Sequence, residues 1–145
     1  MLWDDSEFAG FSNVKPWINV NEDKKDNVKS QMEDEHSLFH FYQDLINIKK
    51  KYVVIKDGKY IPVDLNDRKV FIYKRRNKKE EMVIISNFTN KIVKRKDLIV
   101  YNDYRLLLTN YVNERNDVYL RPYECRILYK RKINGNDKKP KIQKI

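Results

Sequence analysis

Met82-Val83-Ile84-Ile85-Ser86-Asn87-Phe88 is the stretch that decides the fold of this 145-residue chain. Successive side chains of a β-strand point to opposite faces of a sheet, so the four apolar residues from Met82 to Ile85 would fill both faces. A strand that is apolar on both faces lies inside a sheet rather than at its edge. The stretch therefore predicts the central strand of a β domain.

The residues around this stretch also alternate, because Phe71 and Tyr73 are interleaved with Ile72 and Lys74. Turn formers such as Asp57-Gly58 and Asn77-Lys78 break the region about every eight to twelve residues, a spacing typical of small antiparallel domains. We predict a mainly β fold, an antiparallel β-sandwich of two sheets over residues 53–130. The predicted strands are 53–55, 60–63, 70–75, 82–88, 92–95, 105–109, 118–120 and 125–130.

An amphipathic helix is predicted before the β region, at residues 37–52. Apolar residues recur there at three- and four-residue steps, which gathers them on one helix face. Ser37 suits the N-cap, and three consecutive lysines, 49–51, suit the negative end of the helix dipole. Phe39 and Ile46 widen the apolar stripe, so we expect this helix to have neighbours on more than one side.

The two ends of the chain contain few apolar repeats. Residues 1–35 predict a long loop anchored by isolated aromatic side chains, which include Trp3, Phe8, Phe11 and Trp17. Residues 131–145 contain six Lys and Arg against one Asp, and we expect a frayed basic tail there. The net charge of +10 favours nucleic-acid binding only where it is clustered, and outside the tail it is spread out. We therefore interpret it as a solvated surface.

Composition also bounds the cellular setting. Cys125 is the only cysteine, which excludes an internal disulfide and a multi-cysteine metal site. The first residues include Asp4, Asp5 and Glu7 instead of the basic and apolar regions of a signal peptide. Because no apolar stretch approaches the roughly 18 residues of a membrane helix, we expect a cytoplasmic protein that does not contact membranes.

Several motifs resemble one enzyme family in order and spacing. They are Met1 to Ser6 (Met-Leu-Trp-Asp-Asp-Ser), Ala9-Gly10-Phe11, Pro16-Trp17-Ile18, Ser37-Leu38-Phe39, Val83 to Phe88, and Leu120-Arg121-Pro122-Tyr123-Glu124. The family is the α-glucosidase branch of the α-amylase clan, glycoside hydrolase family 13, which includes oligo-1,6-glucosidases and trehalose-phosphate hydrolases. The likeness extends over about nine tenths of the chain. It implies that this chain is a carboxy-terminal portion of such an enzyme.

The resemblance implies a place for each region within the family fold. Residues 1–52 would be the end of a (β/α)8 barrel, namely the loop after its eighth strand and its final helix. Residues 53–130 would be the carboxy-terminal β-sandwich domain, and 131–145 a basic tail. A complete barrel takes about 250 residues, so we expect the barrel core and its catalytic carboxylates to lie on an upstream segment. Met1 would then match an internal methionine of the family loop.

No catalytic residue is assigned within this chain. Retaining glycoside hydrolysis needs two carboxyl groups about 5 to 5.5 Å apart, whereas neighbours such as Asp4 and Asp5 usually point apart. We name Trp3, Asp4, Asp5 and Phe11 as substrate-rim candidates, because aromatic faces stack on sugar rings. The alternative is that they anchor and cap the loop. Leu2 replaces the Gln usual in the family, which removes one polar group from this rim.

Two other candidates for chemistry are interpreted as structural. His36 and His40 lie four residues apart, but neither a cysteine nor a matching carboxylate completes a metal site, so we expect no metal and no cofactor. Cys125 alternates with Ile127 and Tyr129 as a small apolar residue would.

Three functions stay open at this point. The first is a structural, non-catalytic portion of an α-glucosidase, whose partner would be the missing barrel segment and whose oligosaccharide substrate would be bound only by the complete enzyme. The second is a carbohydrate-binding or interaction module built on the β-sandwich. The third, for which the charge distribution gives little support, is a basic nucleic-acid-binding protein.

Overall fold

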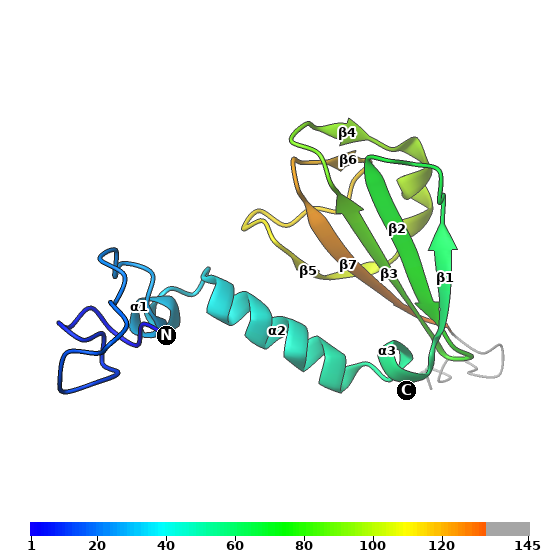
Figure 1. Cartoon of the computed structure of the whole chain (residues 1–145). Coiled ribbons are helices and arrows are strands. Elements are labelled where there is room, and N and C mark those ends of the chain that lie inside the picture. Colours follow the sequence, from blue (N-terminus) through cyan, green and yellow to red (C-terminus); the bar gives the residue numbers. More distant parts are fainter. Residues whose placement is uncertain (133–145) are drawn as a thin grey trace, which may run out of the picture. The chain divides into compact units, whose positions relative to one another are not determined.

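The computed structural model describes residues 1–132 and divides into two compact units, Met1–Asn47 and a second unit that begins at Ile48. The helices are α1 (Val28–Glu33), α2 (Leu38–Lys51), α3 (Val54–Asp57) and the 3-10 helix η1 (Lys96–Tyr101) (Figure 1). The unit boundary falls within α2. The assignment of residues 1–52 and 53–130 to two domains of a parent enzyme stays a prediction, and the predicted tail lies largely outside the described residues.

The second unit is built on a five-stranded antiparallel sheet with the order β1-β2-β3-β7-β5. A two-stranded sheet of β4 and β6 accompanies it. The strands are β1 (Lys59–Val63), β2 (Val70–Arg76), β3 (Glu80–Asn87), β4 (Val93–Lys94), β5 (Arg105–Thr109), β6 (Tyr119–Leu120) and β7 (Cys125–Arg131). The predicted antiparallel β fold is confirmed, and β3, which contains Met82 to Ile85, is the central strand.

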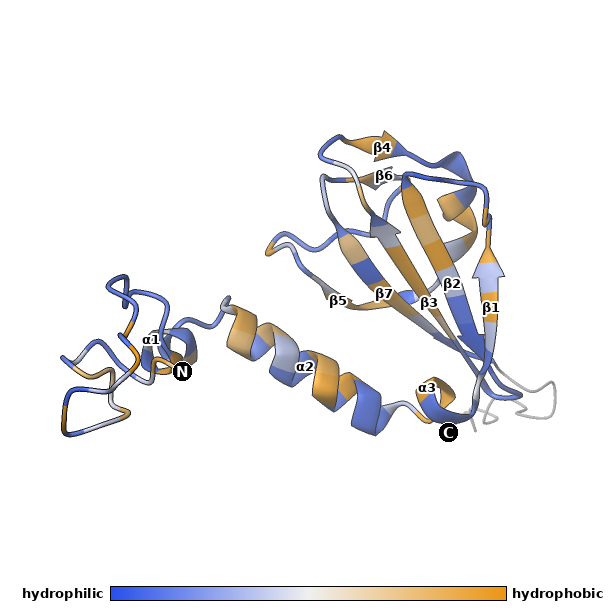
Figure 2. Cartoon of the chain, in the orientation of Figure 1, coloured by the Kyte–Doolittle hydropathy of each residue, from blue (hydrophilic) through white to orange (hydrophobic). Residues whose placement is uncertain are grey.

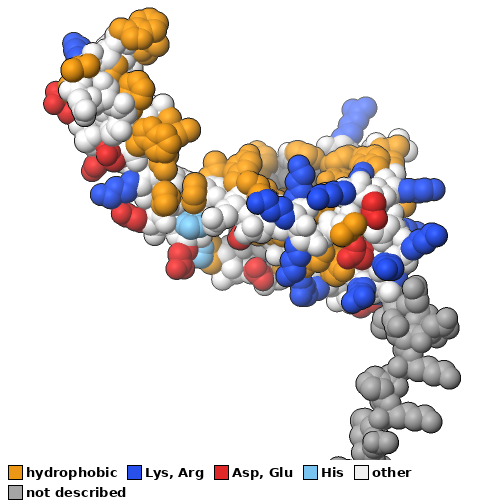
Figure 3. Space-filling model, turned by 90° about the horizontal axis from the view of Figure 1, so that it is seen from below, with side chains coloured by type: hydrophobic (Ala, Val, Ile, Leu, Met, Phe, Trp, Pro, Cys, Tyr) orange, Lys and Arg blue, Asp and Glu red, His pale blue; other side chains and the backbone are white. Residues whose placement is uncertain are grey.

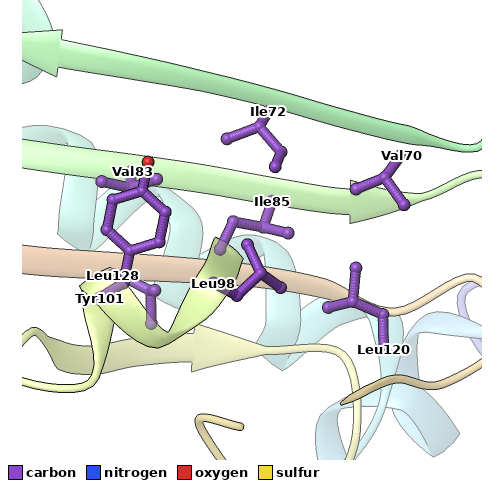
Figure 4. Close-up of a cluster of buried hydrophobic side chains, with 8 residues drawn as sticks. All are labelled: Val70, Ile72, Val83, Ile85, Leu98, Tyr101, Leu120 and Leu128. Carbon is purple, nitrogen blue, oxygen red and sulfur yellow. The ribbon is translucent and has the colours of Figure 1, made fainter. Parts of the chain in front are cut away.

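Each face of the five-stranded sheet has its own hydrophobic cluster. Alternation along β3 sends Val83 and Ile85 to the first face, where β4, β6 and η1 supply further apolar side chains. Figure 4 shows this cluster, and Figure 2 shows the hydrophobic residues along β2 and β3. Met82 on the second face packs with Tyr52 and Val54. The sheet is therefore the middle layer of the unit.

The predicted helix at 37–52 is confirmed as α2. Ser37 caps it, because its hydroxyl accepts a hydrogen bond from the backbone N–H of His40 at 3.4 Å and its carbonyl accepts one from Phe41 at 3.0 Å. None of the helix residues is buried, and Leu38 and Tyr42 are 64% and 58% exposed. An apolar stripe of this width is thus left largely uncovered.

Three local predictions need correction. The predicted strand at 53–55 is wrong, because α3 lies there. Its turn carries the fully buried Val54 into the second cluster, and Glu80 accepts a hydrogen bond from the Val54 backbone N–H at 3.2 Å. The predicted loop at 1–35 includes α1, whose capping box pairs Asn27 with Ser30. Leu98 and Tyr101 are buried from η1, which was not predicted.

Candidate functional site

The opening loop, residues 1–12, is shaped by the carboxylate of Asp4. Asp4 Oδ1 accepts hydrogen bonds from both the backbone N–H of Ser6, at 3.0 Å, and the Ser6 hydroxyl. The Ser6 hydroxyl oxygen in turn accepts from the Gly10 N–H at 2.9 Å. The hydrogen bonds from the Ser6 hydroxyl and N–H lower the pKa of Asp4 below its ordinary value. Asp4 therefore acts as an ionised cap of the loop.

Backbone geometry at the turn of this loop leaves little freedom. Ala9 and Gly10 both have positive φ angles, 56° and 63°. A Cβ atom added at Gly10 would lie 2.6 Å from Asp4 Oδ2. Glycine at position 10 thus serves both the left-handed conformation and the close approach of the carboxylate. The Ala9-Gly10 pair fixes the direction in which the chain leaves the loop.

Two further connections tie the opening loop to the rest of the first unit. The backbone N–H groups of Val28 and Lys29, in the first turn of α1, donate to the carbonyls of Leu2 and Trp3 at 3.0 and 2.9 Å. The Lys24 ammonium donates to the Ser6 and Glu7 carbonyls at 2.7 and 2.8 Å. Polar bonds to the backbone, rather than an apolar core, hold this segment in place.

The predicted rim residues differ in what they present. Trp3 and Phe11 are 50% and 61% exposed, so their aromatic faces are accessible from solvent. Asp5 is exposed as well, whereas Asp4 is partly buried and engaged with Ser6. The structure therefore separates a loop-holding residue, Asp4, from three that extend outward.

A pocket in the first unit lies beside these residues in the sequence but does not include them. Its walls come from the opening loop and the segment that follows it, with Phe8, Pro16 and Val20 among acidic, basic and amide side chains. The complete lining is Glu7, Phe8, Lys15, Pro16, Asn19, Val20, Asn21, Glu22 and Lys24. The sequence analysis did not predict this pocket, because the motif Pro16-Trp17-Ile18 does not show which residues around it form a cavity.

The two histidines serve the entry into α2. His40 Nε2 lies 3.0 Å from the carbonyl oxygen of Met32, and the backbone N–H of His36 donates to Asp34 Oδ1 at 2.9 Å. Within residues 1–132, no group of three His, Cys, Asp or Glu side chains is placed to hold a metal ion. The His40 imidazole thus has a local structural partner, and the His36 backbone is held by Asp34.

Glu124 carries the most deeply buried carboxylate of the second unit and lies in an arginine network. Its carboxylate accepts from the Arg121 guanidinium and backbone N–H, both at 2.7 Å, and from Arg126 Nε at 3.0 Å. Burial acts to raise the pKa of Glu124, but the hydrogen bonds from Arg121 and Arg126 prevail and lower it to about 2. The carboxylate is ionised at neutral pH.

Arg126 is the residue that the sequence reasoning missed at this point. Its side chain is fully buried on the first face of the sheet, where it also donates to the Asp117 carbonyl at 2.6 Å and to the Tyr119 carbonyl. The Cys125, Ile127 and Tyr129 side chains on the other face are only partly buried. The sequence feature that could have indicated the buried Arg126 is Glu124, an acidic residue that lies two positions before Arg126 and three after Arg121.

A second buried carboxylate, that of Glu81, is also paired with basic side chains. It accepts from Arg76 and from the Tyr104 hydroxyl at 2.7 Å, and Lys74 Nζ lies 3.5 Å away. Burial acts to raise the pKa of Glu81, yet these partners lower it below the ordinary value. Both buried carboxylates of the described residues are thus held in their charged form.

Cys125 is a protected thiol. The Ser86 hydroxyl donates to its sulfur at 3.3 Å, and burial raises the pKa of the thiol. A raised pKa lowers the thiolate fraction on which nucleophilic reactivity depends. The prediction that Cys125 behaves as a small apolar residue agrees with this environment.

Figure 3 shows one face on which hydrophobic side chains lie among Lys and Arg. Within residues 1–132, none of the helices combines the length and apolar composition needed to span a lipid bilayer.

Comparisons with known proteins agree with the motifs described above. Residues 1–58 match the family model of the α-amylase catalytic domain. The oligo-1,6-glucosidase of Parageobacillus thermoglucosidasius is 38% identical over 134 residues, which cover 88% of this chain and 24% of the relative. The α-glucosidase of Candida albicans is 36% identical over 130 residues, covering 86% of this chain and 22% of the relative.

A solved structure gives the same result for the fold. The crystal structure of Bacillus licheniformis trehalose-6-phosphate hydrolase matches with a TM-score of 0.76 and 26% identity, over 88% of this chain and 24% of that one. The chain spans about a quarter of the length of the curated relatives it matches. Together these matches support a fragment of an α-glucosidase-like protein of glycoside hydrolase family 13.

Proposed function

We propose that this chain is a structural, non-catalytic portion of an α-glucosidase-type glycoside hydrolase. The complete enzyme would hydrolyse α-glucosidic bonds of short oligosaccharides with retention, using carboxylates on its barrel segment, which is the partner of this chain. We place it in the cytoplasm, where a single unpaired cysteine is stable. In this proposal the chain stabilises the barrel and contributes no reacting group.

The state of the buried carboxylates carries the proposal. The general acid of a retaining glycosidase needs a raised pKa, so that it still holds its proton near neutral pH. Glu124 and Glu81 have lowered pKa values instead, and each is bonded to arginine. Their environments suit charge pairs that fix strands and turns. This arrangement supports a stabilising role for the β unit.

The opening loop would form one lip of the sugar site in the complete enzyme. Exposed Trp3 and Phe11 offer flat apolar faces, and Asp5 adds a carboxylate. Asp4 would act at this lip by holding the loop in shape through Ser6. These roles depend on the barrel segment, which would supply the rest of the site.

The test uses three proteins based on the P. thermoglucosidasius oligo-1,6-glucosidase. One is the complete enzyme, one lacks the quarter that this chain matches, and one carries this chain in place of that quarter. We expect the deletion to abolish hydrolysis of an isomaltose-type substrate and the chimera to restore it. This chain alone should show no hydrolysis. Hydrolysis by the chain alone would contradict the proposal, as would a folded but inactive chimera.

A further inference from the structure

The second face of the five-stranded sheet is only partly covered. Over β3 and β7, Met82 and the partly buried Ile127 and Tyr129 pack with Tyr52 and Val54 from the segment before β1. Toward β1 and β2 the same face carries aromatic side chains that remain accessible. The first face differs, because η1, β4 and β6 all contribute to its cluster.

Four of these side chains form a continuous row, which we call the aromatic row and define as Tyr60, Tyr73, Phe71 and Phe88. Consecutive ring centroids lie 5.3, 5.6 and 6.4 Å apart. Tyr60 is 51%, Phe71 39% and Phe88 66% exposed. Single exposed apolar residues are common, but a contiguous group of this kind marks an interaction surface.

Strand register shows that the row continues the second cluster. Phe71 and Tyr73 alternate with the buried Val70 and Ile72, so they lie on the second face. Tyr73 pairs with Ile84, which packs against the cluster around Met82. The aromatic row is therefore the uncovered extension of an existing apolar layer, and a further layer placed on it would extend the same core.

Ring orientation distinguishes between two kinds of occupant. Neighbouring rings of the aromatic row are tilted by 39°, 43° and 50°, so they do not form one flat platform on which a sugar chain could stack. Tilted rings present both edges and faces, which suits interdigitation with the side chains of a protein. The phenyl groups of Phe71 and Phe88 also bring no hydroxyl to bond a sugar. The geometry favours a protein partner over a glycan.

The size of the relatives identifies that partner. This chain covers 24% of the P. thermoglucosidasius enzyme, so about three quarters of that enzyme has no counterpart in the matched region. We propose that the aromatic row is the surface of the β unit that docks onto that remaining portion of the α-glucosidase-like protein. This inference rests on the proposed structural role, and it assigns the contact to particular residues.

The test compares the same substitutions in two contexts, the chain by itself and the chimera described above. Phe71→Thr with Phe88→Thr removes two rings of the row, and threonine keeps the preference for extended backbone. In the isolated chain both rings are exposed, so the midpoint of thermal unfolding should fall by less than ~2 °C. In the chimera the temperature of half-inactivation should fall by more than ~5 °C, because the rings would be buried there.

A matched pair of exposed residues supplies the control. Ile99 and Val100 of η1 are 61% and 64% exposed, and η1 belongs to the layer on the opposite face. Ile99→Thr with Val100→Thr should shift the two midpoints by equal, small amounts. Equal shifts for the Phe71 and Phe88 substitutions in both contexts would overturn the docking surface.

The outcomes separate this inference from the proposed function. An inactive but folded chimera would reject the proposed function, and the docking surface with it. An active chimera that tolerates the Phe71 and Phe88 substitutions would reject the docking surface alone. Titration of the isolated chain with maltooligosaccharides gives a further result: binding that is lost with both phenylalanines would assign the row to glycans and overturn the proposal.

Discussion

The two compact units of this chain bury very different amounts of apolar surface. In the described part of the first unit, Ala9 is the one apolar residue that is fully buried, whereas the second unit buries the other eleven. The first unit relies on caps and bonds to the backbone, such as those of Asp4, Lys24 and Asn27. Burial of apolar area is the main favourable term in folding. The comparison indicates that the second unit can be stable alone, while the first depends on added contacts.

Removing the Arg126 guanidinium should cause the largest loss in the free energy of unfolding of the second unit, and so narrow its difference from the first. Arg126→Met leaves the buried carboxylate of Glu124 with one fewer cation, and breaking a buried pair in this way costs about 4 kcal/mol. Urea unfolding followed by the near-ultraviolet signal measures the loss. Arg115→Met is the control, because the Arg115 side chain is 45% exposed. Equal losses for the two variants would contradict the assigned importance of the network.

Truncating the first-face cluster should have the next largest effect. Leu128→Ala removes a fully buried side chain from β7, which costs about 3 kcal/mol through lost transfer energy and the cavity left behind. Leu65→Ala, at a position 75% exposed, should change the free energy of unfolding by less than about 0.5 kcal/mol. A small loss at Leu128 would show that the cluster is not the core of the second unit.

Acid should weaken the second unit through Glu124. The pKa of Glu124 is about 2 in the folded chain and near 4.5 when unperturbed. A carboxylate with a lowered pKa stabilises the fold above its unfolded pKa and loses that contribution as the pH falls. The loss between pH 4.5 and pH 2 is at most about 3 kcal/mol. Urea midpoints across this range should fall, and Glu124→Gln should flatten the profile; an unchanged slope would exclude Glu124 as the cause.

The smallest effect is expected in the first unit. Gly10→Ala places a Cβ 2.6 Å from Asp4 Oδ2 in a residue with φ of 63°, which should cost about 1 kcal/mol locally. Amide exchange at Ala9 and Phe11, whose N–H groups bond Ser6 and Phe8, should become about fivefold faster. The unfolding midpoint of the second unit should stay constant. A shift there would show that the two units unfold together.

Sequence reasoning predicted the β unit well, because its signals are local. Met82 to Ile85 identified the central strand, and the predicted span 105–109 coincides with β5. It failed at residues 53–55, where β-branched Val53, Val54 and Ile55 favour a strand but burial of Val54 selects a helical turn. The capping box at Asn27 was overlooked because Ser30 replaces the usual Glu or Gln.

The candidate site was less predictable for a physical reason. Motifs identified Trp3, Asp4, Asp5 and Phe11. Which of them holds the loop and which stay exposed depends on hydrogen bonds around Ser6 and Gly10. Burial of Arg126 is likewise set by partners in other segments, Asp117 and Tyr119. Spacing alone does not show which of several charged side chains faces inward. Long-range partners decide that.

The position of β7 has a consequence for synthesis of the chain. Within residues 1–132, β7 is the last strand in sequence, yet it lies between β3 and β5, and β5 pairs with β7 alone. During translation the edge of β3 and the whole of β5 stay unpaired until residues 125–131 leave the ribosome. A polypeptide halted before Cys125 would present open strand edges to proteases and to other nascent chains. Pairing of β7 is therefore the step that completes the five-stranded sheet.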